Sequence, residues 1–235
     1  MAISLDAATS SAVSTTGTLA WNHIVGSGAN RLLVVGIGAY GLSSQPSVTG
    51  VTYGGVAMTL ARRDQAEASS YYLETSVWIL KNPGTGTHSI SATITGNSPE
   101  SGGVSVSYTG CAQTNSPDAA NGAVGTTTGG DQSFNVTTSA DNCWIFAVGC
   151  LRKASASSIT ALQTSRGNVD IHTTAVKMRA EDTNAAQTPA GAKSVGFTLS
   201  TSNTKWCMSG ASFAPYVSGS QSVVPVIMNS YRHKN

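Results

Sequence analysis

The stretch Leu32-Leu33-Val34-Val35-Gly36-Ile37-Gly38-Ala39 decides the fold, because it returns as Cys143-Trp144-Ile145-Phe146-Ala147-Val148-Gly149-Cys150. In the same frame, Val48-Thr49-Gly50-Val51 returns as Ile159-Thr160-Ala161-Leu162. Four consecutive apolar residues in each copy of the first stretch are typical of a central strand that is covered on both faces. The chain therefore predicts two copies of one β-rich unit.

Four further segments recur in the same order. They are Trp21-Asn22 with Phe134-Asn135, 78–81 with 176–179, 89–94 with 194–199, and 106–108 with 211–213. The matched segments retain the alternation of apolar and small polar residues that strand pairing requires, while nearly every chemically reactive residue differs. This pattern indicates that a shape is maintained, and it identifies no activity.

Each copy contains short strand patterns separated by turns rich in Gly, Asn, Pro and Ser, with no convincing helix. In the first copy we expect strands near 19–24, 32–40, 48–53, 76–81, 88–95 and 104–108. In the second copy we expect them near 133–137, 144–151, 158–164, 174–179, 194–199 and 207–213. The predicted fold class is all-β, an antiparallel β-sandwich of the jelly-roll or Ig-like kind, built from two repeats.

We divide the chain into a first repeat (1–110), a connector (111–130), a second repeat (131–216) and a C-terminal arm (217–235). Composition leaves open whether the repeats form one sandwich or two. Segments 62–72, 167–173 and 181–192 are expected to be long loops, and long loops at one end of a sandwich often carry recognition.

The composition is poor in charge, with 10% Asp, Glu, Lys and Arg and a formal net charge of +2. An average soluble domain has roughly 25% of these residues. The dense basic spot Arg62-Arg63 is followed by Asp64 and Glu67, so we expect no nucleic-acid partner. A surface kept soluble by hydroxyls and amides instead of charge suits a protein that is exported or packed into an assembly.

The first residues show neither a basic region nor an apolar run typical of a secretory signal. No apolar run approaches the ~20 residues that would span a bilayer. We therefore expect synthesis in the cytoplasm and no membrane insertion.

The four cysteines are Cys111, Cys143, Cys150 and Cys207, and none of them forms a CxxC pair. Cys143 and Cys150 lie on one predicted strand and point to opposite faces, which excludes a disulfide between them. We expect free, buried thiols and no zinc site.

The acidic residues fall mainly in predicted loops, and no pair of them recurs between the copies. Asp64 with Glu67 could serve a glycosidase, and Glu181 with Asp182 could hold calcium, but solvated loop charges are the expected state of all four. The histidines lie alone in sequence, without metal-binding spacing. We therefore predict no catalytic residue, no metal site and no cofactor, and a protein that is not an enzyme.

A carbohydrate site is the main alternative. Tyr71 and Tyr72, beside Arg63 and Asp64, could form an aromatic platform with polar neighbours. The competing interpretation is that one tyrosine faces the core and the other is an ordinary strand residue.

After Pro215 the repeat pattern ends, and 218–222 has the composition of a flexible hinge. The arm that follows is apolar and then basic. Its predicted assembly residues are Val223, Val224, Val226, Ile227, Met228, Tyr231 and Arg232. The arm could dock on a neighbouring subunit by strand addition, or fold back as an edge strand of its own sandwich, since Pro225 confines it to an edge.

The first copy also resembles a known family. The resemblance rests on 30–36, 48–59, 78–83, 86–88 and 106–110. These segments resemble a duplicated β-sandwich module of uncharacterised phage virion proteins and bacterial surface proteins, over about residues 18–215. In the second copy, Ser165-Arg166-Gly167 and Glu181-Asp182 replace the family's Gly-Gly and Asn-Pro turns.

The resemblance implies a fold and offers no catalytic residues. With the composition it favours a non-enzymatic structural protein of a phage particle, such as a head decoration, tail or fibre component. Its expected location is the virion and its expected partners are other virion subunits, including further copies of itself. The alternative is a carbohydrate-binding adhesion module that contacts a cell-surface glycan.

Overall fold

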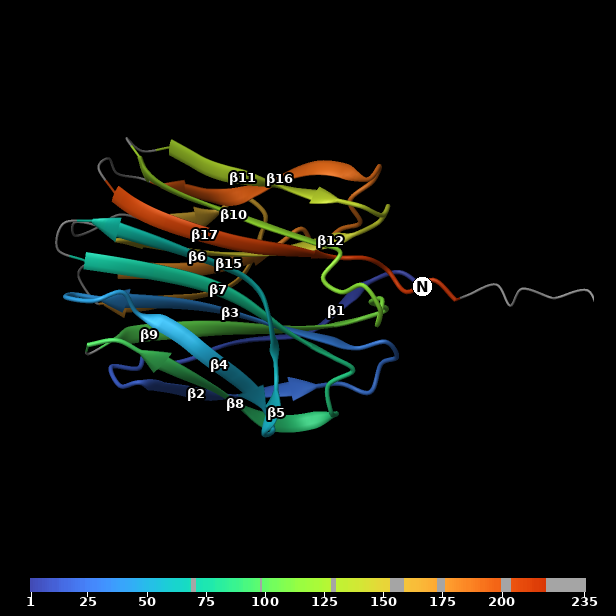
Figure 1. Cartoon of the computed structure of the whole chain (residues 1–235). Helices are drawn as coiled ribbons and strands as arrows, with labels where there is room; N and C mark the ends of the chain where they lie inside the picture. Colours follow the sequence, from blue (N-terminus) through green and yellow to red (C-terminus); the bar gives the residue numbers. More distant parts are fainter. Residues whose placement is uncertain are drawn as a thin grey trace, which may run out of the picture.

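The structure, a computed structural model, describes residues 1–68, 71–97, 99–127, 130–152, 159–172, 176–199 and 204–218. Within these residues the chain contains no helix, and its strands form four antiparallel sheets (Figure 1). This confirms the predicted all-β, antiparallel fold class.

The first half of the chain forms two sheets. The first inner sheet has the order β1 (Ser4–Ser10), β9 (Glu100–Thr109), β3 (Leu32–Gly41), β7 (Tyr71–Lys81) and β6 (Thr59–Ala68). The first outer sheet has the order β2 (Thr18–Val25), β8 (Gly86–Thr95), β4 (Ser47–Tyr53) and β5 (Val56–Ala57).

The second half repeats this arrangement. The second inner sheet has the order β10 (Ala119–Thr127), β17 (Thr204–Phe213), β12 (Trp144–Arg152), β15 (Val176–Asp182) and β14 (Thr164–His172). The second outer sheet has the order β11 (Gly130–Thr138), β16 (Gly191–Leu199) and β13 (Ile159–Ala161). The strand orders correspond from β1 and β10 onward, except that β5 has no counterpart in the second half. Internal duplication stays a prediction, which these matching orders support.

The four sheets stack as layers, and the two inner sheets face each other (Figure 1). A central core lies between them, to which β3 contributes Leu32 and Val34 and β12 contributes Phe146 and Val148. At Gly36 the approach is so close that an added Cβ would lie 2.9 Å from the Phe146 ring. The halves share a core, so they form one continuous four-layer body.

Each inner sheet also packs on its own outer sheet. Leu33 and Val35 of β3 belong to a core shared with the first outer sheet, and Ile145 and Ala147 of β12 to a core shared with the second. Successive strand residues point to opposite faces. Both β3 and β12 are therefore apolar on both faces, as their continuous apolar runs predicted.

Strand pairing corrects two of the matches drawn from the sequence. Leu32 pairs with Tyr108, and Trp144 pairs with Phe213, so Leu32 corresponds to Trp144 and not to Cys143. A one-residue slip would place residues of the central core opposite residues of an outer core. Likewise, Ile79 pairs with Val34 and Asp182 with Phe146, so 78–81 does not match 176–179.

Three predicted irregular segments are strands. The expected loop 62–72 consists mostly of β6 and the start of β7, the expected loop 167–173 lies largely in β14, and the connector 111–130 contains β10. β1 was not predicted at all. β1, β6, β10 and β14 all lie at sheet edges. Edge strands bury only part of each face, so their polar residues hide the alternation on which sequence reasoning depends.

Candidate functional site

The four predicted glycan-binding residues do not converge on one surface. Asp64 points toward the second inner sheet, where its Oδ2 accepts a hydrogen bond from Ser209 Oγ at 2.7 Å. Arg63, the preceding residue on β6, points to the opposite face, where its Nε lies 3.2 Å from Glu74 Oε1. Both side chains are engaged inside the fold.

Tyr71 and Tyr72 also diverge, because they are successive residues of β7. Tyr71 packs against the central core, and the Arg152 guanidinium lies 3.9 Å from its ring centroid. Tyr72 points to the other face and pairs with Gly41 and Glu67. The structure therefore places these four residues on two faces of one sheet and does not assemble the predicted platform.

The predicted assembly arm lies almost wholly outside the described residues. This applies to all its named positions, Val223, Val224, Val226, Ile227, Met228, Tyr231 and Arg232. The described chain ends at Ser218, and Val217 before it is 77% exposed.

The expectation that Glu181 and Asp182 are solvated loop charges is wrong. Both lie at the end of β15 and are fully buried. Glu181 accepts hydrogen bonds from the backbone nitrogens of Gln163 at 2.9 Å and Gly196 at 2.7 Å. Burial raises the pKa of Glu181 to about 7. The carboxyl ties the inner sheet to the backbone of the outer layer above it.

Asp182 joins the two halves across the central core. Tyr108 of β9 donates from its hydroxyl to Asp182 Oδ2 at 2.6 Å, and Arg166 Nε lies 2.7 Å from the same oxygen. In the first half, Glu74 performs the task of Glu181, because its Oε1 accepts a hydrogen bond from Val48 N at 2.9 Å. Burial raises the pKa of Glu74. The three buried carboxyl groups therefore have a structural role, because each one hydrogen-bonds to another layer of the fold.

One acidic residue does recur between the halves. Asp6 Oδ2 accepts hydrogen bonds from Ser107 Oγ at 2.7 Å and from Gly26 N, just after β2, at 2.8 Å. Asp118 Oδ2 accepts from Ser212 Oγ at 3.0 Å and from Ser139 N, just after β11, at 2.9 Å.

The residues next to these two aspartates have matching strand partners, since Ala7 pairs with Ser107 and Ala119 with Ser212. The sequence signal is the triplet Asp-Ala-Ala at 6–8 and 118–120. The separation of Asp6 from Asp118 equals that of Leu32 from Trp144. Sequence comparison missed this match because it used a separation one residue shorter.

His23 lies in a buried polar network with two serines and an aspartate. These are the residue types of a Ser-His-Asp catalytic triad, but here they have a structural role. Its Nδ1 lies 3.0 Å from Ser105 Oγ and its Nε2 lies 3.1 Å from Ser107 Oγ, while Ser107 donates onward to Asp6. The imidazole is 1% exposed, and burial lowers its pKa to about 4. Both nitrogens are occupied by hydroxyls, and the network holds β2 against β9.

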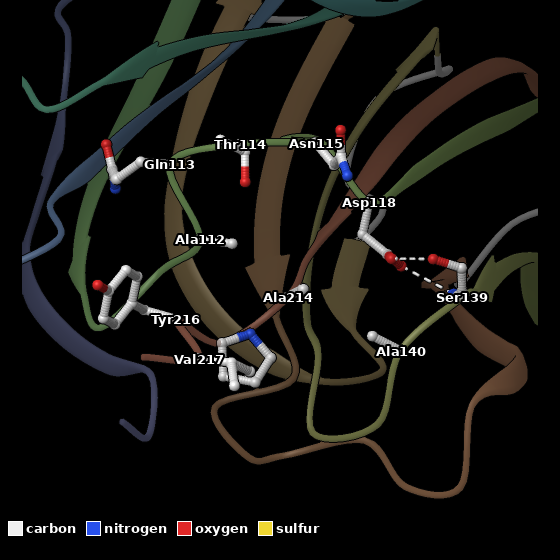
Figure 2. Close-up of a pocket in the computed structure, with 11 residues that line it drawn as sticks. Ala112, Gln113, Thr114, Asn115, Asp118, Ser139, Ala140, Ala214, Tyr216 and Val217 are labelled. Atoms are coloured by element: carbon white, nitrogen blue, oxygen red, sulfur yellow. Dashed lines mark hydrogen bonds between the residues drawn. The ribbon is translucent and has the colours of Figure 1, made fainter. Parts of the chain in front are cut away.

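Two pockets flank Pro215–Val217 at the end of the body where the N-terminus lies (Figure 1). The first, named the polar end pocket after its polar side chains at 113–115, 118 and 139, has a volume of about 330 Å³ and is shown in Figure 2. It is lined by Ala112, Gln113, Thr114, Asn115, Asp118, Ser139, Ala140, Ala214, Pro215, Tyr216 and Val217.

The larger end pocket has a volume of about 600 Å³ and is mainly apolar. It is lined by Met1, Ala2, Ile3, Asn142, Trp144, Ala186, Pro215, Tyr216, Val217 and Ser218. The segment between the pockets is anchored by backbone hydrogen bonds, from Tyr216 N to Gly110 O at 2.7 Å and from the Met1 amino group to Tyr216 O at 2.8 Å. The two pockets are the candidate functional site.

Among the described residues, no group of three or more His, Cys, Asp and Glu side chains could hold a metal ion. The four cysteines are all buried and free, as predicted. The same part of the chain holds no helix that is long and apolar enough to cross a membrane.

Comparisons with protein-family models, curated proteins and solved structures found no match to this chain. The candidate site therefore rests on its own geometry.

Proposed function

We propose that this chain is a non-enzymatic structural subunit of a phage particle, a head decoration, tail or fibre component, that assembles with neighbouring subunits through strand edges and its C-terminal arm. The observation that carries the proposal is the larger end pocket. It lies beside Val217 and Ser218, at the root of the arm, and offers an apolar surface around Trp144. The apolar residues of the arm, 223–228, match that surface in chemistry.

The outward face of the first outer sheet supports packing into an assembly. On β8, every second residue from Thr87 to Thr95 points outward and carries a hydroxyl group, namely Thr87, Ser89, Ser91, Thr93 and Thr95. The outward residues of the neighbouring β2 are Thr18, Ala20, Asn22 and Ile24. A face without charge can contact another subunit without the desolvation cost of burying ions.

Strand edges offer a second kind of contact. The outer sheets end in the long strands β2 and β11 on one side and in the short strands β5 and β13 on the other. The long edges are the ones on which a neighbouring strand could add. The virion setting itself rests on the family resemblance of residues 18–215.

The test compares the mass in solution of the full chain with that of a chain ending at Ser218, by light scattering. This end point keeps Tyr216 and both of its backbone hydrogen bonds. We expect a defined oligomer for the full chain and a folded monomer for the shorter one. The proposal is overturned if both chains form species with the same number of subunits.

A pair of matched variants locates the contact. Ala186→Trp fills the larger end pocket, and Ala140→Trp makes the same change in the polar end pocket. Only Ala186→Trp should reduce the oligomer to monomer. An oligomer that survives Ala186→Trp would show that the arm binds elsewhere.

A further inference from the structure

The polar end pocket is built from three kinds of wall (Figure 2). Gln113, Thr114 and Asn115, from the segment between β9 and β10, form one side of the pocket. Asp118 and Ser139 stand together on a second side, where they hydrogen-bond to each other, and the Tyr216 ring stands apart from them on a third.

The polar side chains and the tyrosine ring of the pocket suit a carbohydrate ligand. Amides and hydroxyls can both donate and accept hydrogen bonds, and a tyrosine ring offers a flat apolar face with a polar tip. A sugar ring presents hydroxyls around its edge and C–H groups on its face, so it can contact both the polar side chains and the tyrosine ring. A volume of about 330 Å³ lies at the lower end of the range of small-molecule sites.

The Gln113 side chain holds this side of the pocket in place. Its Nε2 donates to Arg31 O at 3.0 Å and to Cys111 O at 3.1 Å, which fixes the orientation of the amide. Its Oε1 is buried and has no hydrogen-bond partner among the described residues. Because this oxygen has almost no accessible surface, a ligand in the pocket does not reach it, and the groups open to a ligand on this side are the exposed Thr114 and Asn115.

The charge of the pocket limits the ligand further. Asp118 is the only ionisable acid or base among the lining residues other than the Tyr216 phenol. Burial alone would raise the pKa of Asp118, but hydrogen bonds from Ser139, Ser212 and Cys143 outweigh burial and lower it. The carboxyl is therefore ionised at neutral pH and repels anionic ligands.

Comparison of the two halves shows which polar groups of the pocket have a structural role in both halves and which occur in the second half alone. The contacts of Asp118 recur at Asp6 and are structural. The polar wall does not recur, because Met1-Ala2-Ile3 precedes Asp6 where Gln113-Thr114-Asn115 precedes Asp118. The second half thus carries, on a shared scaffold, polar groups that have no counterpart in the first half.

We infer that the polar end pocket binds a neutral carbohydrate, with Tyr216 stacking on a sugar ring and Thr114 and Asn115 bonding hydroxyls of the ligand. Neutral and amino sugars are accepted, and uronic and sialic acids are rejected by Asp118. This inference goes beyond the proposed assembly role and replaces the Tyr71–Tyr72 platform as the location of a glycan site.

The experiment uses the full chain on an array of immobilised glycans with neutral, amino and acidic terminal sugars, followed by calorimetric titration with the tightest free glycan. Ala140→Trp fills the pocket without removing any of its polar groups and is expected to lower the affinity at least tenfold. Tyr216→Ala should have a similar effect. In the titration with free glycan, Ala186→Trp and Tyr72→Ala, which lie outside this pocket, should bind with the per-site affinity of the unaltered chain.

Near-ultraviolet circular dichroism confirms that each variant is folded. If Tyr216→Ala fails to fold, Ala140→Trp still decides the question. The inference is overturned if no neutral or amino sugar binds, if acidic glycans bind best, or if Ala140→Trp binds with unchanged affinity. Because Ala186→Trp tests assembly separately, failure of the glycan inference leaves the assembly proposal untouched.

Discussion

Asp6 and Asp118 occupy the same place in the two halves of the chain. Each aspartate accepts a hydrogen bond from the serine on the neighbouring strand, Ser107 or Ser212, and from the backbone nitrogen that follows the first strand of its outer sheet. The carboxylate thus ties an inner sheet to an outer sheet. Because the two contacts match in detail, they support duplication more strongly than the apolar pattern does.

The two aspartates should differ in their contribution to stability. Asp118 is partly buried and also accepts a hydrogen bond from Ser139 Oγ, whereas Asp6 is exposed. Hydrogen bonds to charged groups contribute about 1.5–3 kcal/mol each where they are buried. We expect Asp118→Ala to lower the free energy of unfolding by about 2–4 kcal/mol and Asp6→Ala by clearly less, as measured by urea denaturation. Equal losses would show that burial does not distinguish the two sites.

Sequence patterns predicted the central strands well and the edge strands poorly. β3 and β12 are apolar on both faces, so they can be recognised whatever their partners are. β6 carries Arg62, Arg63, Asp64 and Glu67. These charges are typical of a loop in the sequence, because their partners lie on other strands, Glu74 on β7 and Ser209 on β17.

The candidate site could not be predicted from the sequence for a related reason. Gln113 and Asp118 come from the segment between β9 and β10, Ser139 from the segment between β11 and β12, and Tyr216 from beyond β17, so the site forms no local motif. The Asp-Ala-Ala triplet was a visible signal, but a one-residue error in the separation between the copies concealed it. Register, which pairing alone reveals, was the missing information.

The two halves should unfold together. They share the central core, and Tyr108 of the first half donates to the buried Asp182 of the second. Tyr108→Phe removes that donor and leaves the carboxylate short of one partner, at an expected cost of about 2–3 kcal/mol. Urea denaturation followed by tryptophan fluorescence and by circular dichroism should give coincident single transitions for both proteins. Two separated transitions would contradict a shared core.

The four thiols should be unreactive in the folded protein. Burial raises the pKa of Cys111 and of Cys143 to about 12, and it raises the pKa values of Cys150 and Cys207 as well. Thiolates are the reactive form, so a disulfide reagent at pH 8 should label none of the four rapidly without denaturant and all of them in urea. The variant Cys207→Ser is the control for the number of labelled thiols, because it should show one fewer than the unaltered chain in urea. Rapid labelling of one thiol in the native state would mark a local opening.

Two buried groups should oppose each other in the pH dependence of stability. Burial lowers the pKa of His23 from 6.5 to about 4, so unfolding takes up a proton between these values and stability falls as the pH is lowered. Burial raises the pKa of Glu181 from 4.5 to about 7, so unfolding releases a proton in that range and stability rises as the pH is lowered. Each slope is at most about 1.4 kcal/mol per pH unit.

Between pH 4.5 and 6.5 the contributions of His23 and Glu181 should therefore nearly cancel. Glu181→Gln removes one of them, and its free energy of unfolding should fall relative to the unaltered chain as the pH is lowered through this window. His23→Gln should show the opposite trend. The measurement is the urea denaturation midpoint of all three proteins at intervals of about one pH unit, with identical ionic strength. If His23→Gln does not fold, Glu181→Gln carries the test alone, because a pH dependence identical to that of the unaltered chain would contradict a buried, protonated Glu181.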